Sequence, residues 1–66
     1  METTNDLRKQ VIQRARAMRR AVPGLRVGQA HYNALCELDP ELAKAIPNEC
    51  DPFYDDRKLA RFLDEL

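Results

Sequence analysis

The spacing of apolar and polar positions predicts an amphipathic helix over the first third of the chain. From Thr4 to Ala21, apolar side chains recur every three or four residues, which places them on one side of a helix. These apolar positions are Leu7, Val11, Ala15, Met18 and Val22. Thr4 or Asn5 is suited to cap the start of this helix, and Pro23 followed by Gly24 is suited to end it.

A second helix with one apolar face is predicted from about Arg26 to Leu38. The residues on that face are Val27, Ala30, His31, Ala34, Leu35 and Leu38. The start of this helix has two interpretations, because Gly28 lies either inside the first turn or at the N-cap. His31 is expected to be a packed histidine with one hydrogen bond.

Two shorter helices complete the pattern. Asp39 followed by Pro40 is a typical helix start, and it predicts a short helix that ends near Ile46. After a loop over residues 49–54, Asp55 or Asp56 is suited to cap a last helix. The apolar positions of that helix are Leu59, Phe62, Leu63 and Leu66.

The composition agrees with a helical domain. Eight Leu and eight Ala stand against only three Val, two Ile and two Thr, so helix formers outnumber strand formers. A chain of 66 residues is too short for two hydrophobic cores. The sequence therefore predicts an all-α fold, a small bundle of three to four short helices that forms a single domain over residues 1–66.

Few side chains are suited to catalysis or metal binding. His31 and Cys36 are five residues apart, so on one helix they point about 140° away from each other. We interpret Cys36 and Cys50 as small buried or half-buried thiols, since a dyad of Cys50 with His31 has no residue to orient it. The acidic residues near Cys50 lack the glycine-centred spacing of a calcium loop. We expect no catalytic site, no metal and no cofactor.

The chain also lacks the sequence signals of a membrane or secreted protein. No stretch approaches the roughly 18 continuous apolar residues that a membrane span requires. The first six residues do not have the basic and then apolar character of a signal peptide. These features predict a cytoplasmic location.

The charges are divided between the two halves of the chain. Residues 1–30 carry seven basic side chains against two acidic ones, and residues 31–66 carry four against nine. The total of zero is therefore the sum of a +5 half and a −5 half. Such asymmetry is typical of an interaction surface, but it is also what two mutually neutralising halves of one domain would show.

The first helix provides the main candidate surface. Lys9, Gln13, Arg16 and Arg20 form a polar stripe almost opposite the apolar one, with Arg8 and Arg19 on one flank and Arg14 on the other. A second candidate is the pair of adjacent aromatics before the last helix, where Tyr54 is expected to keep its hydroxyl in water. The predicted partner-contacting residues are Lys9, Arg16, Arg19, Arg20, Tyr54 and Asp55.

Residues 25–66 carry three motifs in succession. An Arg-x-Gly-Gln-Ala-x-x-Asn-Ala-Leu helix begins at Arg26, a Pro-Glu-Leu turn begins at Pro40, and an Asp-Pro-Phe-Tyr-Asp-Asp segment begins at Asp51. Together they resemble a widespread group of small uncharacterised proteins from bacteriophages, prophages and bacteria. The resemblance implies an intracellular, phage-related protein and no particular activity. The positions that match are Arg26, Gly28, Gln29, Asn33 and Asp51 to Asp56, and Gln29 and Asn33 are suited to tie the second helix to that last segment.

These observations favour a small non-enzymatic helical interaction protein, a phage-type accessory or regulatory protein that binds a protein or another macromolecule. The alternative is a small nucleic-acid-binding protein that uses the basic side of the first helix. Against that alternative, the short helix that follows Asp39 begins with Glu41 and does not resemble a recognition helix. The sequence does not determine the oligomeric state.

Overall fold

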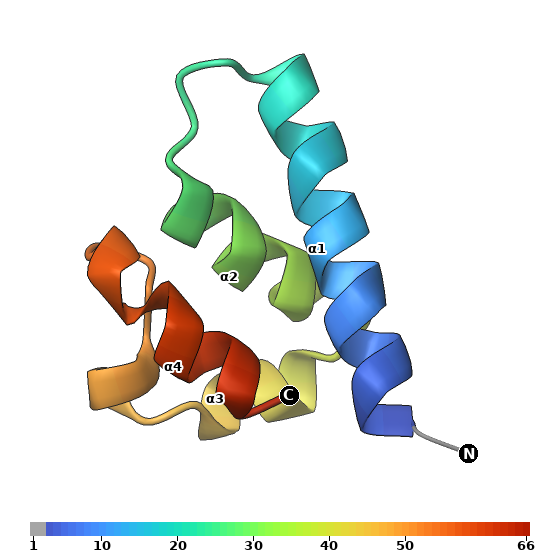
Figure 1. The fold of residues 1–66 in the computed structure, drawn as a ribbon, viewed down its shortest axis with the longest axis vertical. Helices are drawn as coiled ribbons and strands as arrows, with labels where there is room; N and C mark the ends of the chain where they lie inside the picture. Colours follow the sequence, from blue (N-terminus) through green and yellow to red (C-terminus); the bar gives the residue numbers. More distant parts are fainter. Residues whose placement is uncertain (1–2) are drawn as a thin grey trace.

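Four α-helices and two 3-10 turns form the fold in the computed structural model, which describes the backbone of residues 3–66 and the side chains of residues 6–66 (Figure 1). The elements are α1 (Thr3–Ala21), α2 (Val27–Leu38), α3 (Pro40–Ala45), η1 (Asn48–Cys50), η2 (Asp56–Lys58) and α4 (Leu59–Asp64). Residues 3–66 contain no strand. The predicted all-α bundle is confirmed, and each predicted helix is present within a few residues of its expected bounds.

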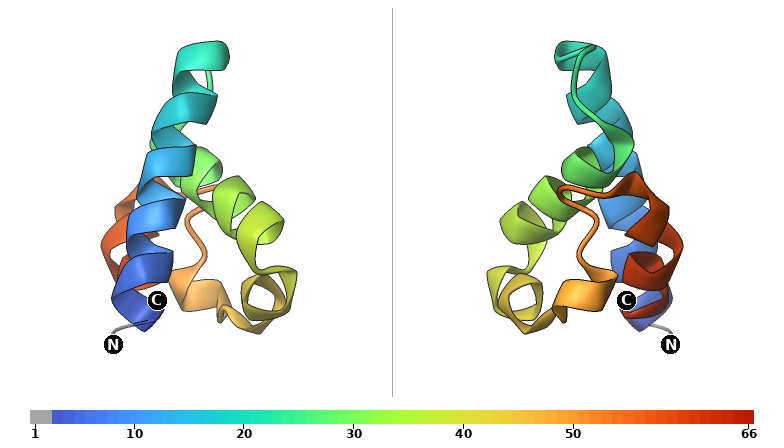
Figure 2. Two further views of the ribbon diagram at one scale, coloured as in Figure 1. Left: turned by 90° about the vertical axis from the view of Figure 1, so that its right-hand side faces the viewer. Right: turned by 90° about the vertical axis from the view of Figure 1, so that its left-hand side faces the viewer.

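The long helix α1 forms one edge of the molecule. A short turn after α1 leads into α2, which packs against α1 at an oblique angle as the chain returns toward the other end of the molecule (Figure 1). The chain then turns through α3 and η1, and the following loop brings η2 back against α2. The C-terminus lies at the same end of the molecule as the start of α1 (Figures 1 and 2).

The core lies where α1, α2 and α4 meet. Its buried residues are Val11, Ala15, Ala30, Ala34, Leu35, Ala43, Phe62 and Leu66. The alanines let neighbouring helices approach closely, while Phe62 and Leu35 are the largest fully buried side chains. Pro52 is also fully buried, which the sequence pattern did not predict. Val22, the last of the apolar positions predicted for the first helix, is not buried: 53% of its surface is exposed because it lies beyond the last turn of α1.

The helix starts follow the predicted signals in part. Asp39 is the N-cap of α3, and its carboxylate accepts a hydrogen bond from the Leu42 N–H at 3.1 Å. The predicted N-cap of α1 was wrong, because the helix begins at Thr3 and both Thr4 and Asn5 lie inside its first turn. Gly28 is not the N-cap of α2 either, since Arg26 occupies that position.

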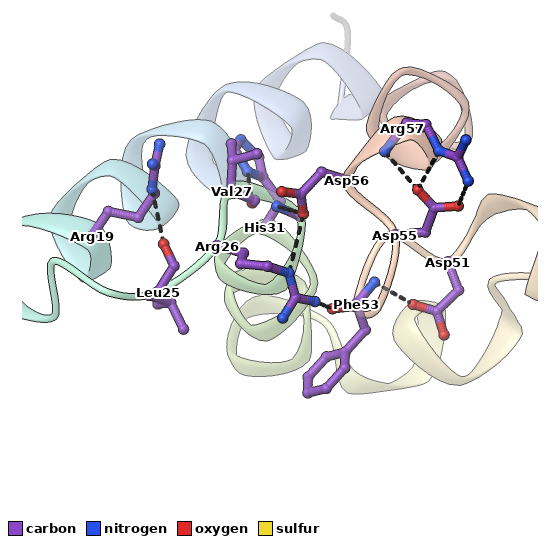
Figure 3. A network of polar contacts seen from close by, with 11 residues as sticks. Arg19, Leu25, Arg26, Val27, His31, Asp51, Phe53, Asp55, Asp56 and Arg57 are labelled. Carbon is purple, nitrogen blue, oxygen red and sulfur yellow. Dashed lines mark hydrogen bonds and ion pairs between the residues drawn. The ribbon is translucent and has the colours of Figure 1, made fainter.

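Gly28 instead joins α2 to the loop before α4. Its N–H donates to the Asp56 carboxylate at 3.0 Å. The Arg26 guanidinium lies 3.6 Å from the same carboxylate and donates to the Phe53 carbonyl oxygen (Figure 3). The Phe53 N–H in turn donates to Asp51 at 2.9 Å. The sequence hypothesis that Gln29 and Asn33 make this connection is therefore replaced by contacts from Arg26 and Gly28.

Candidate interaction surface

The four predicted basic contacts of α1 all face solvent. We call Lys9, Arg16, Arg19 and Arg20 the basic face of α1, and all four side chains are exposed. With 100° between successive residues, Lys9, Arg16 and Arg20 fall nearly opposite the buried positions Val11 and Ala15. The burial of the apolar stripe in the α1–α2 contact therefore orients the basic face outward, and no other described element covers it (Figure 2).

The acidic half of the chain leaves the basic face without ion pairs. Within the described residues three ion pairs form, and the only one that includes α1 joins Arg14 Nη1 to Glu37 Oε1 at 2.6 Å. The other two pairs are Arg26 with Asp56 and Arg57 with Asp55. Internal neutralisation, the alternative interpretation of the divided charge, therefore applies to Arg14 and Arg26 and not to the basic face.

Three arginines of the basic face gather at the C-terminal end of α1. Arg16, Arg19 and Arg20 line an open hollow of about 370 Å³ together with Pro23. The Arg19 Nε donates to the Leu25 carbonyl oxygen at 3.2 Å, which holds this side chain against the turn (Figure 3). The negative end of the helix dipole favours the two arginines in the last turn. Arg16 lies one turn earlier, where it repels both neighbours by a few tenths of a kcal/mol.

The other predicted contacts, Tyr54 and Asp55, belong to the segment just before η2, which Figure 1 shows on the other side of α2 from α1. Tyr54 is 87% exposed, and its ring contacts Phe53 edge-on with the centroids 4.7 Å apart. This exposure agrees with the prediction that the Tyr54 hydroxyl stays in contact with water. Asp55 is occupied within the chain, since its carboxylate accepts bonds from the Arg57 N–H and guanidinium at 3.0–3.1 Å. The structure thus separates the six candidate residues into two distant groups.

The Arg57 contacts hold the pKa of Asp55 below its ordinary value. The largest cause is the hydrogen bond from the Arg57 side chain, followed by the bond from the Arg57 N–H. A depressed carboxyl pKa means that the ionised form stabilises the fold above the unfolded pKa of about 3.9. That contribution is lost as the pH falls through the lower folded-state pKa.

Asp55→Asn should therefore lower stability at neutral pH but not in acid, because asparagine keeps an acceptor for the Arg57 N–H and removes only the charge. Urea midpoints of wild type and variant, measured at a series of pH values, should differ above about pH 4 and converge below it. A gap that stays constant across the whole series would contradict the role of the charge.

The histidine and the cysteines occupy dissimilar positions. His31 is 7% exposed and its Nδ1 lies 2.7 Å from the Val27 carbonyl oxygen, as expected for a packed histidine with one hydrogen bond. Both thiols are free. Cys50 is buried, which together with nearby Glu65 raises the pKa of its thiol and keeps it protonated. Cys36 is exposed, so its interpretation as a buried or half-buried thiol was wrong.

Two structural features bear on the expectations for metals and membranes. Among residues with described positions, no three His, Cys, Asp or Glu side chains gather closely enough to hold a metal ion. Over the same residues, no helix has the length and apolar character needed to cross a bilayer.

The sequence did not predict an apolar hollow on the seam between α1 and α2. The hollow has a volume of about 550 Å³, and its lining residues are Met18, Ala21, Val22, Leu25, Asn33 and Glu37. The sequence feature that could have indicated this hollow is Val22, an apolar residue just before a proline. Its spacing instead indicated the apolar side of the first helix. Glu37 at the edge of this hollow is the residue that pairs with Arg14.

No known protein family, no curated protein and no solved structure matches this chain. The resemblance of residues 25–66 to small phage and bacterial proteins therefore stays a prediction. What the structure adds is a physical role for several of the matching positions: Arg26, Gly28, Asp51 and Asp56 fix the loop before α4 against α2.

Proposed function

We propose that this chain is a small non-enzymatic helical interaction protein that binds an anionic macromolecular partner through the basic face of α1. The observation that carries the proposal is that Lys9, Arg16, Arg19 and Arg20 are exposed and form no ion pair with any described residue. Arg14, Arg26 and Arg57, in contrast, pair with acids of the same domain. A cytoplasmic, phage-type accessory or regulatory role belongs to the same proposal.

Two other observations support an interaction role. The three arginines that line one hollow repel one another, and an anionic partner would relieve this repulsion on binding. The side chains whose chemistry is best suited to catalysis are not on this surface. His31 is packed against the backbone of its own helix, and the Cys50 thiol is buried and protonated. These positions favour a binding surface over a catalytic one.

Retention on heparin–agarose, a general polyanion, tests the proposal. Arg16→Gln with Arg20→Gln removes two charges of the basic face while keeping good helix formers. Lys44→Gln with Arg61→Gln is the matched control, because both residues are exposed, lie on α3 and α4, and remove the same charge. The first variant should bind about 100-fold more weakly at low salt and elute earlier, whereas the control should elute with wild type.

Equal shifts for the two variants would show that net charge alone governs retention. A wild-type protein that passes through the column at low salt would also overturn the proposal. Circular dichroism of each variant checks that the helices are intact.

A further inference from the structure

We infer that the partner of the basic face is the phosphate backbone of a duplex nucleic acid, which α1 contacts along its length without reading base sequence. The inference rests on the proposed function and names its partner class. Three observations carry it: the length of the basic face, its lack of exposed large apolar side chains, and the absence, among residues 3–66, of a second element suited to reach the bases.

The basic face matches the spacing of phosphates along a strand. Lys9 and Arg20 are eleven residues apart, and a rise of 1.5 Å per residue puts them about 16 Å apart along the axis of α1. Along one strand of a DNA duplex, successive phosphates are about 3.4 Å apart in the direction of the duplex axis, so about five phosphates cover the same length. Four cationic side chains can therefore each meet a phosphate along one helix.

The chemistry of this side of α1 fits phosphates better than an acidic protein. Protein interfaces depend on buried aromatic and apolar anchors, and charged residues are depleted at their centres. Between Lys9 and Arg20 the exposed positions on this side hold Gln13 and Arg16, and the one large apolar residue in this direction, Ile12, is half-buried. Arginine, lysine and glutamine are residues that commonly donate to phosphate oxygens.

The surroundings of the basic face also favour a long polyanion. Asp6 is the only acid in α1, and it lies in the first turn. The outer side of α1 is uncovered over its whole described length, so a straight duplex meets no obstruction there (Figure 2). The segment that carries the highly exposed Tyr54 lies on the other side of α2 from α1 in Figure 1, away from the bases of a single strand bound at α1.

Reading of base sequence would require a further element beside α1. A recognition helix follows a tight turn. The helix in that position here, α3, has only six residues and carries Glu41 in its first turn. A carboxylate in that position repels phosphates. The binding is therefore expected to be independent of sequence, with a dissociation constant of about 1–100 µM at physiological salt.

Fluorescence anisotropy with a short labelled DNA duplex tests the inference, using two unrelated sequences, the matching single strands and labelled polyglutamate as probes. If four phosphates are neutralised, wild-type affinity for either duplex should fall about 150-fold between 50 and 200 mM salt. For Arg16→Gln with Arg20→Gln, two remaining contacts predict a fall of about 12-fold. Lys44→Gln with Arg61→Gln should behave as wild type, and the single strands should bind no more tightly than the duplexes.

The outcomes separate this inference from the proposed function. Binding to polyglutamate that depends on Arg16 and Arg20, with no binding to the duplexes, would overturn the inference and leave the proposed function standing. No binding to any of these polyanions would overturn both. A duplex affinity that does not change with salt concentration would also overturn the inference, and so would a difference of more than about tenfold between the two sequences. Contact with the phosphate backbone alone predicts neither result.

Discussion

Replacement of Gly28 with alanine is expected to destabilise the domain by about 3 kcal/mol, a large share of the roughly 5 kcal/mol that holds a small domain folded. A Cβ atom on Gly28 would lie 2.3 Å from the Pro52 carbonyl oxygen and 2.7 Å from the Asp56 carboxylate. The carboxylate is at the end of a side chain and can move, but the carbonyl belongs to the backbone of a buried proline. Relief of the clash therefore has to displace the loop from α2. Urea unfolding followed by circular dichroism measures the loss.

Gly24→Ala is the matched control for this prediction. A Cβ atom there meets nothing within 4 Å, and no glycine in the chain has a positive φ. Alanine at that position restricts the unfolded chain and should leave stability equal to wild type or raise it by up to about 1 kcal/mol. Equal stability of the two alanine variants would mean that the contact between Gly28 and Pro52 is not tight.

Phe62→Ala is expected to have the largest effect, a loss of about 3–5 kcal/mol, which would leave most molecules unfolded. The Phe62 side chain has no exposed surface, and its ring centroid lies 6.3 Å from that of Tyr32. Removal of the ring takes away apolar burial and leaves a cavity that three surrounding elements cannot fill without moving. Far-UV circular dichroism and the thermal unfolding curve measure the result.

Tyr54→Ala is the control for aromatic truncation, because the Tyr54 ring is 87% exposed. Its stability should stay within about 0.5 kcal/mol of wild type. If the two aromatic variants unfold at similar temperatures, burial of the Phe62 ring does not stabilise the fold as expected.

The sequence predicted the helices because their periodicity and start signals are local. Asp39 and the proline after it, for example, mark the start of α3 whatever surrounds them. Burial depends on how far a neighbouring element extends, and the spacing of Val22 carries no information on that. The same limit explains Pro52, which is buried because η2 and its loop fold back on α2, a contact between segments far apart in the sequence.

The candidate surface was predictable to a similar extent. Spacing alone placed Lys9, Arg16 and Arg20 on the side of α1 away from the core. Which charges would pair was not predictable, since Arg14 meets Glu37 from a different helix, 23 residues away. Asp55 was expected to face a partner because the sequence does not reveal that the guanidinium two residues later folds back onto it.

The positions of the charged groups have a consequence for encounters in solution. The basic face lies on α1, and most acidic residues belong to the segments after α2, which lie to the left of α1 in Figure 1. A molecule with zero net charge arranged in this way is an electric dipole. The field of a polyanion exerts a torque on such a dipole and turns α1 toward the polyanion before the surfaces touch. Neutrality thus limits long-range attraction but still favours a productive orientation at each collision.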